Sequence, residues 1–252
     1  MVNVEISTHW NRYLSLFPAS EKDVYFTEEY IRLYETESEK ALCFIYTDGN
    51  EVLLFPFLTR SFEFEEKIYR DFETAYGYGG PIYNTDNENF IAKALKLFKT
   101  YCKEEGYVAG FVRFHPLLAN IQCFDQIGKL QPERQTVAIN LDQSIEKVWM
   151  NEIHTKNRNV IKKGERSGLK FEADYEYKHL RDFRKLYNST MEKLSADDFY
   201  YFNDTYYENL VRNIPGSFLG CVFKETQLVS AAIFFFGNHW GHYHLSGSDR
   251  SQ

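Results

Sequence analysis

The sequence has few cysteines, no long apolar run and no leader-like start. Its four cysteines are far apart and form no CxxC pair, which argues against a disulfide framework or a zinc site. The longest apolar run, Val229 to Phe236, is far shorter than the roughly 18–20 residues of a membrane-spanning helix. Residues 1–10 contain no basic segment followed by an apolar core, so we expect no signal peptide. These absences predict a cytoplasmic protein with reduced thiols and no membrane span.

Several motifs of catalysis and cofactor binding are also missing. The sequence has no GxSxG elbow, no HExxH helix and no GxGxxG fingerprint, which leaves covalent hydrolase and dinucleotide chemistry without support. The one glycine-rich loop, Tyr76 to Pro81, lacks the Lys-Ser/Thr ending of a P-loop. His242 and His244 would offer zinc only two ligands. We therefore expect no metal and no bound cofactor.

What is present indicates a folded protein of one large or two modest domains. The chain has 252 residues, 44% hydrophobic and 17% aromatic, with a net charge of −7. Two apolar runs, residues 41–47 and 52–59, flank a turn at 48–50 and predict a hairpin. A charged link over 60–70 should follow, and then a helix over 88–105 that Asn87 caps and Gly106 ends. Further strands are expected at 108–114 and 136–140.

The character of the chain changes at Asp142. Apolar residues at helical spacing predict one long helix that ends near Ser167 and Gly168. Another helix is expected over 180–194, and a third with Asp197 or Asp198 as its cap. Three strands should follow at 218–223, 228–236 and 240–245. The interpretation is a mixed α+β or α/β fold with domains at 1–141 and 142–252.

The two halves contain a weak internal repeat. Residues 44–57, with their central turn, match residues 221–233, and the loop 76–80 then falls opposite residues 243–248. Such repeats indicate duplicated supersecondary units. The second unit stops at Gln252, so we expect it to be incomplete and the native chain to continue.

A basic run is the most informative local feature. Residues 156–170 hold six basic side chains and one acid in a protein of net charge −7. The run is either a solvated helix face or a site for an anion such as phosphate, for which Lys156, Arg158 and Lys162 are the candidate ligands. The sequence pI near 5.6 argues against a dedicated duplex-DNA binder.

A polar row on one predicted strand is the second feature. Strand alternation puts His242, His244, Ser246 and Ser248 on one face. Three interpretations are open. The row lies on an edge strand that faces water, it contains hydrogen-bonded histidines of the core, or it forms the wall of a substrate cleft in which histidine transfers a proton. Adjacent tyrosines on a helix cannot all point inward, so Tyr200 and Tyr201 are candidates to line a cleft.

Four motifs together resemble one known family. They are the segment that ends in YGYGGP (residues 76–81), the run KNRNVIKKGERSGL (156–169), the pair LYNSTM (186–191) and YYF (200–202), and YHLSGS (243–248). Together they are similar to the FemABX-like acyltransferases, over nearly the whole chain. The resemblance implies tandem GNAT-type domains, of which the second is truncated or degenerate here, since no Gln/Arg-x-x-Gly-x-Gly/Ala loop is present.

The resemblance also implies a reaction and its participants. Members of the family transfer an acyl or aminoacyl group, from acyl-CoA or aminoacyl-tRNA, to an amine of a bacterial peptidoglycan or sugar-linked precursor in cell-wall biogenesis. An anionic lipid- or nucleotide-linked acceptor would then face the basic run. We expect His242 or His244 to act as base or proton relay, with Tyr200, Tyr201, Ser246, Tyr76 and Tyr78 contacting substrate. The alternative is a non-catalytic module that binds an anionic cell-envelope precursor or a partner protein.

Overall fold

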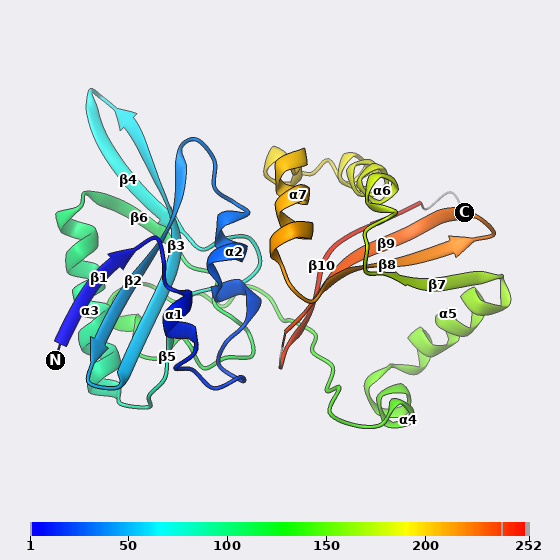
Figure 1. Ribbon diagram of the computed structural model, residues 1–252, viewed down its shortest axis with the longest axis horizontal. Coiled ribbons are helices and arrows are strands. Elements are labelled where there is room, and N and C mark those ends of the chain that lie inside the picture. The colour runs from blue at the N-terminus through cyan, green and yellow to red at the C-terminus, as the bar shows by residue number, and fades with distance from the viewer. Residues whose placement is uncertain (1, 238, 250–252) are drawn as a thin grey trace. The chain divides into compact units, whose positions relative to one another are not determined.

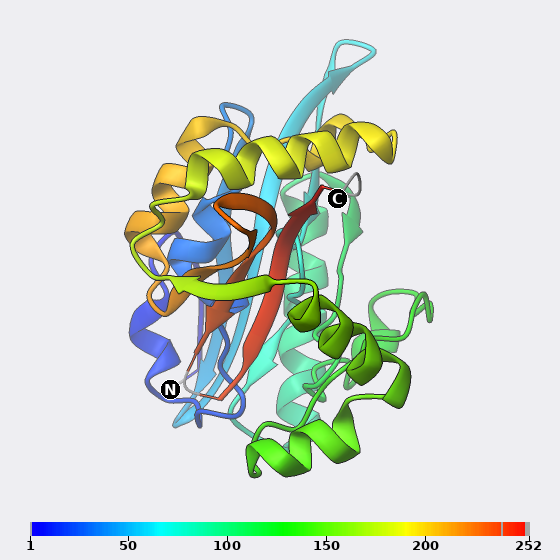
Figure 2. The ribbon, with the colours of Figure 1, turned by 90° about the vertical axis from the view of Figure 1, so that its right-hand side faces the viewer.

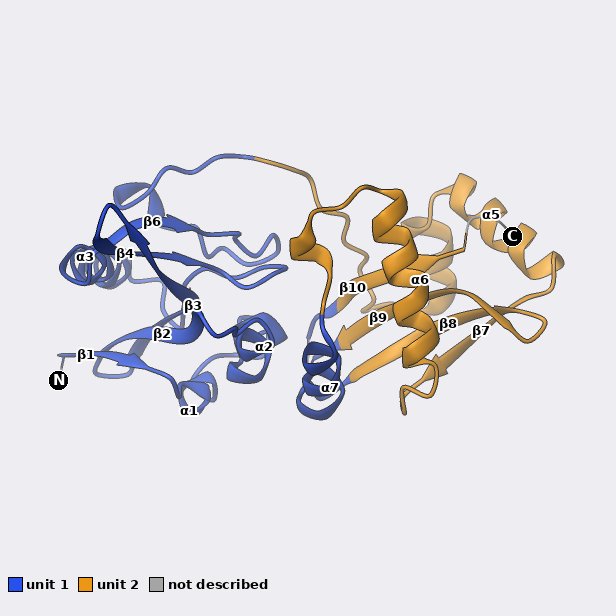
Figure 3. Cartoon of the chain, turned by 90° about the horizontal axis from the view of Figure 1, so that it is seen from above, with its two compact units in different colours: residues 1–132, 203–216, 236–241 blue, residues 133–202, 217–235, 242–252 orange. Residues whose placement is uncertain are grey.

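The chain folds into two compact units that interleave along the sequence (Figure 1 and Figure 3). In this computed structural model, residues 2–237 and 239–249 are described. The first unit contains residues 1–132, 203–216 and 236–241, and the second contains 133–202, 217–235 and 242–252. The expected boundary between 141 and 142 stays a prediction. Asn238 and the last three residues, including Gln252, beyond which the native chain was expected to continue, lie outside the described residues.

A six-stranded sheet forms the centre of the first unit. Its strands are β1 (Val2–Ser7), β2 (Glu39–Asp48), β3 (Glu51–Phe64), β4 (Lys67–Glu73), β5 (Ile82–Tyr83) and β6 (Tyr107–Phe111). The order is β1-β2-β3-β4-β6, with β5 beside β3. Neighbours from β1 to β4 are antiparallel, whereas β6 runs parallel to β4. The predicted hairpin is confirmed as β2 and β3, and Gly49 supplies the positive φ of its turn.

The expected charged link over 60–70 is wrong, because β3 and β4 continue through it as a two-stranded ribbon. Glu65 and Glu66 both have positive φ and close the turn. Arg60 pairs with Asp71 across the strands, and the rings of Phe62 and Tyr69 stack at 6.0 Å. The ribbon projects from the sheet (Figure 1 and Figure 2). Its side chains pair with one another rather than with a core, so it lacks the alternating pattern of a half-buried strand.

The first unit also contains helices. They are α1 (Asn11–Leu14), α2 (Glu28–Arg32), α3 (Glu88–Glu104) and α7 (Asp204–Asn213). The predicted helix is confirmed as α3, with the Asn87 side chain accepting a hydrogen bond from the Phe90 amide. Its buried residues join a core cluster with β2 and β3 that includes Phe44, Phe55, Phe57, Phe90, Ile91 and Phe98. The strand expected over 108–114 ends at Phe111.

The second unit holds a four-stranded sheet in the order β10-β9-β8-β7. Its strands are β7 (Leu169–Asp174), β8 (Ser217–Lys224), β9 (Gln227–Phe236) and β10 (Gly241–Ser248), with helix α6 (Leu180–Lys193). The helix over 180–194 and the three final strands are therefore confirmed. The buried residues of this unit include Phe183, Tyr187, Leu219, Cys221, Ile233, Phe235 and Leu245. The cap of α7 is Asn203, and Asp197 instead caps a short 3₁₀ turn at Asp198–Tyr200.

The long helix expected after Asp142 is broken. It consists of α4 (Ile145–Lys147), a wide π-type turn (Val148–Glu152) and α5 (Thr155–Arg166), and residues 136–140 form no strand. Ile153 has extended backbone angles and separates the turn from α5. The apolar stripe that predicted one helix is exposed, since Ile145 is 81% and Val160 62% accessible. Without a surface to pack on, the stripe does not hold the segments in one helix.

One order of elements occurs twice in the chain. A strand, two helices and three further strands of the same sheet follow one another as β1, α1, α2, β2, β3, β4 and as β7, α6, α7, β8, β9, β10. The matched hairpins β2–β3 and β8–β9 occupy the same place in this order. The loop 76–80 follows β4, however, whereas residues 243–248 form β10 itself, so that part of the alignment is wrong. The fold is mixed α+β with two sheets.

Among the described residues, no helix combines the length and apolar composition needed to cross a bilayer.

Candidate functional site

The basic run lies mainly on α5, in the second unit, and its last residue, Lys170, lies on β7. No residue of α5 is buried, and the helix begins where the His154 ring accepts a hydrogen bond from the Lys156 amide at 3.2 Å. The charged end of Lys162 lies 5.9 Å from the centre of the Trp149 ring, a cation–π contact. Lys156 and Lys162 therefore present positive charge to solvent.

Arg158 has a different role from the two lysines. Its guanidinium donates to the carbonyl oxygens of Trp149, Met150 and Ile153 at 3.1, 3.0 and 2.5 Å. A further bond reaches the Thr155 hydroxyl at 2.9 Å. Trp149 and Met150 belong to the wide turn, and Ile153 directly follows it. Arg158 thus fixes the turn to the start of α5, with both terminal nitrogens of its guanidinium hydrogen-bonded to the protein.

The two candidate histidines on β10 have different environments. His242 is half-buried, whereas His244 is 8% exposed and its ring lies 4.4 Å from that of Phe235. Burial, and secondarily the neighbouring His242, lowers the pKa of His244 to about 3. His244 is therefore neutral near pH 7 and holds a proton too weakly to be an effective general base there.

The end of β10 packs directly on α6. A Cβ added to Gly247 would lie 2.5 Å from the backbone of Leu186 and Tyr187, so only glycine allows this approach. The Thr190 hydroxyl accepts from the Ser248 amide at 3.1 Å. Ser246, a predicted substrate contact, is half-buried on the same strand.

Tyr200 and Tyr201 lie in the chain that follows α6. The Tyr187 hydroxyl donates to the Tyr200 carbonyl at 2.8 Å, which ties this chain to α6. The two tyrosines are 37% and 38% exposed. The second unit therefore contains His242, His244, Ser246, both tyrosines and the basic helix; the roles expected for these residues stay predictions.

Tyr76 and Tyr78 belong to the first unit, in the loop after β4. The Tyr76 carbonyl accepts from the Tyr30 hydroxyl at 2.6 Å, and the Tyr78 ring lies 5.5 Å from Tyr25. The loop is also tied down at Gly79, whose amide donates to the Arg113 carbonyl and whose carbonyl accepts from the Asn120 side chain. The glycine-rich segment is thus a loop that hydrogen bonds to Tyr30, Arg113 and Asn120 hold in place. Its expected role in substrate binding stays a prediction.

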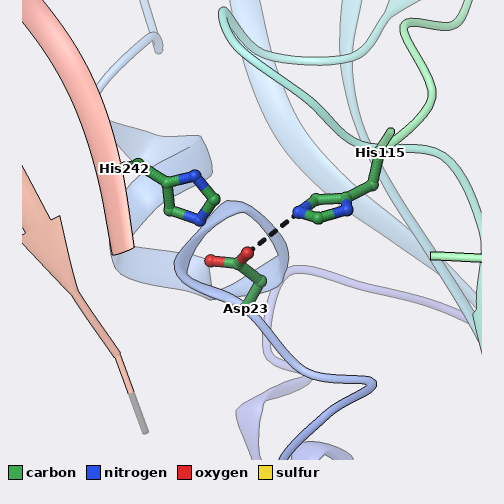
Figure 4. Close-up of side chains that lie close together, drawn as sticks. All are labelled: Asp23, His115 and His242. Carbon is green, nitrogen blue, oxygen red and sulfur yellow. Dashed lines mark hydrogen bonds and ion pairs between the residues drawn. The ribbon is translucent and has the colours of Figure 1, made fainter. Parts of the chain in front are cut away.

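A buried Asp–His pair in the first unit was missed by the sequence analysis. His115 Nε2 lies 3.0 Å from Asp23 Oδ2, and the two side chains are 0% and 1% exposed (Figure 4). The Leu117 amide donates to His115 Nδ1 at 3.2 Å, which assigns the ring proton to Nε2. The pair is 92 residues apart in sequence, so no local pattern connects the two residues. His242, also drawn in Figure 4, belongs to the second unit.

Aromatic rings surround this pair within the first unit. Tyr25, Phe26, Tyr78 and Trp240 have ring centres 5.6–6.2 Å from that of His115. Burying the Asp23 carboxylate among aromatic rings is unfavourable unless it accepts hydrogen bonds, and His115 donates one. Within its unit the pair orients an imidazole and joins the chain before α2 to the loop after β6.

A second feature of the first unit is a small polar hollow beside α2 and α7. It has a volume of about 230 Å³ and is lined by Glu29, Arg32, Leu33, Asn209 and Asn213. Arg32 is already engaged with the Thr8 carbonyl and Glu28. The hollow therefore has polar walls but no uncommitted arginine.

Comparisons with known proteins define the fold. No protein-family model matches the chain, and no curated protein matches it in sequence. Among solved structures, it is similar to the C-terminal domain (DUF2156) of a protein described as a lysylphosphatidylglycerol synthetase from Agrobacterium fabrum. The TM-score is 0.54 at 12% identity, over 96% of this chain and 68% of that chain. At this identity the likeness is one of fold, and the two-sheet α+β architecture of this chain is that of the DUF2156 domain.

Proposed function

We propose that the protein is an acyltransferase that moves an acyl or aminoacyl group from an activated donor to a cell-envelope precursor. The observation that carries the proposal is the fold similarity over 96% of the chain to a domain of a protein described as a lysylphosphatidylglycerol synthetase. The repeated order of strand, two helices and three strands supports a tandem GNAT-type organisation. The motifs of the sequence add the resemblance to FemABX-like enzymes.

The chemistry needs a base, a positioned nucleophile and stabilisation of negative charge. An acceptor amine or hydroxyl loses its proton and attacks the ester carbonyl of aminoacyl-tRNA or the thioester carbonyl of acyl-CoA. The attack forms the new C–N or C–O bond and a tetrahedral oxyanion. Collapse of this intermediate breaks the ester C–O or thioester C–S bond of the donor, and the ribose hydroxyl or the thiol leaves with a proton. Both donors are cytoplasmic molecules, so we propose that the reaction takes place there.

Within this proposal His242 is the better candidate base. It is half-buried, whereas the pKa of about 3 leaves His244 ill-suited to accept a proton near pH 7. Tyr200, Tyr201 and Ser246 would contact the acceptor, and Lys156 and Lys162 would hold its phosphate groups. Arg158 is a weaker candidate for that role, because its guanidinium already donates to three carbonyl oxygens at the wide turn.

A mass-spectrometric screen tests the proposal. The protein is incubated with acetyl-CoA or charged tRNA, and with either an amine-bearing muropeptide or vesicles that contain phosphatidylglycerol. We expect one donor–acceptor pair to give an acylated product. His242→Gln should then reduce turnover by roughly 10²- to 10⁴-fold, the range for loss of a general base. The control is His239→Gln, because His239 is exposed.

A non-catalytic role is the second candidate. The pKa of His244 removes one of two expected bases, whereas the exposed lysines of α5 need no catalysis to bind an anion. A module of this kind would bind an anionic precursor and turn over no donor. Saturable precursor binding without product from any donor would favour it over the acyltransferase.

A further inference from the structure

Helix α5 combines exposed apolar and basic side chains. Val160 is 62% and Ile161 42% exposed, although aliphatic residues next to each other on a helix usually face a core. A Cβ added to Gly164, one turn further on, would lie 3.3 Å from the Leu169 side chain of β7. No residue of α5 is buried, so its apolar stripe lies outside the buried core of the second unit.

The charges are arranged around this stripe. Lys156, Val160 and Lys163 follow one another at spacings of four and three, which places both lysines beside the valine on the helix surface. Lysine side chains in this position can extend their charge away from an apolar surface while their methylenes cover it. Glu165 is the one acid among residues 156–170. Arg158 fixes the helix to the preceding turn, where Met150 is 61% exposed.

We propose that α5 is an interfacial helix that docks the protein on an anionic bilayer surface. Val160 and Ile161 enter the boundary between headgroups and acyl chains, while Lys156 and Lys163 contact lipid phosphates. RNA is disfavoured as the occupant, because phosphate contacts along a nucleic acid give no reason to expose two aliphatic side chains between the lysines. The inference stands without the proposed function, since docking requires no transfer reaction.

Vesicle co-sedimentation with the full chain tests this proposal. The vesicles are pure phosphatidylcholine, or phosphatidylcholine with about 30% phosphatidylglycerol, and unfractionated tRNA is added as a competitor. We expect binding to the anionic vesicles only, weakened by salt. The double variant Lys156→Gln/Lys163→Gln should bind roughly 10- to 30-fold more weakly, from about 1 kcal/mol per lysine near such a surface.

Two matched controls separate local from general effects. Lys96→Gln/Lys99→Gln removes the same charge from the exposed side of α3 and should leave partitioning within about twofold of the parent. Val160→Ser/Ile161→Ser should weaken vesicle binding by roughly tenfold or more and leave any tRNA binding unchanged. Its control, Ile68→Ser/Val108→Ser, changes two residues that are 77% and 58% exposed in the first unit and should have no effect. Circular dichroism verifies that each variant is folded.

The proposal is overturned by any of three results. One is the absence of binding to anionic vesicles, or equal binding to both vesicle types. Another is equal weakening by the lysine variants of α5 and α3, which would show only a response to net charge. The third is tRNA binding that requires Lys156 and Lys163 while vesicle binding does not, which would make α5 an RNA-binding helix.

Discussion

The low pKa of His244 predicts that the second unit loses stability in mild acid. The pKa falls from 6.5 to about 3 on folding because the ring is buried against Phe235. A histidine whose folded pKa is lowered is protonated preferentially in the unfolded chain. Stability is therefore full above about pH 6.5 and declines as the pH falls, until the folded pKa is reached.

The magnitude follows from linkage. At pH 5.0 an unfolded histidine of pKa 6.5 is almost fully protonated and the buried one is neutral, which costs about 2 kcal/mol of unfolding free energy relative to pH 7.5. The figure stays at about 2 kcal/mol for any folded pKa below about 4, because the folded state then binds almost no proton at pH 5.0.

Urea unfolding followed by circular dichroism at pH 7.5 and 5.0 measures this effect. Other groups also titrate in this range, so the quantity of interest is the pH-dependent loss in the parent minus that in His244→Gln. We expect a difference of about 2 kcal/mol. His239→Gln, at an exposed position, should keep the parent's pH dependence. Equal losses in the parent and in His244→Gln would refute the reasoning, and with it the argument against His244 as a base.

Three further predictions concern stability. Arg158→Gln should destabilise the second unit by about 1–2 kcal/mol because three carbonyls lose their donor, whereas Lys156→Gln should change the urea midpoint little. Gly247→Ala should cost about 1–3 kcal/mol, since its Cβ would overlap the backbone of α6; an unchanged melting temperature would contradict the close packing. Glu28 accepts from the Trp10 and Asn11 amides and contacts Arg32, and although desolvation acts to raise its pKa, these bonds lower it overall. Glu28 therefore stabilises the fold above its unfolded pKa and loses that effect as the pH falls; Glu28→Gln should lower the melting temperature at pH 7 and much less at pH 3.

Local patterns predicted the elements whose signals lie within a few residues. The α3 helix has a cap at Asn87, a stripe of buried residues and a terminating glycine, all inside one window. The turn at Gly49 and the three strands after Ser217 are of the same kind. The prediction of one long helix after Asp142 was wrong. The apolar residues do recur at helical spacing, but they stay exposed, and periodicity alone does not show whether a packing surface exists.

The candidate site was only partly predictable for the same reason. The basic run and the histidines of β10 are visible in the sequence, but the two histidines look equivalent there. Burial distinguishes them, and burial depends on how β10 packs against neighbouring elements. Arg158 looks like any other cation in the run until the wide turn brings three carbonyls to it.

By itself, the sequence determined the mixed composition of strands and helices, the basic character of residues 156–170 and the repeated hairpins. These follow from local propensity, charge and periodicity, which depend on neighbours along the chain. The tertiary structure decided that Asp23 meets His115 across 92 residues, that His244 is buried and that Val160 and Ile161 are exposed. Each of these depends on contacts between distant segments, and solvent exposure and pKa are properties of such contacts.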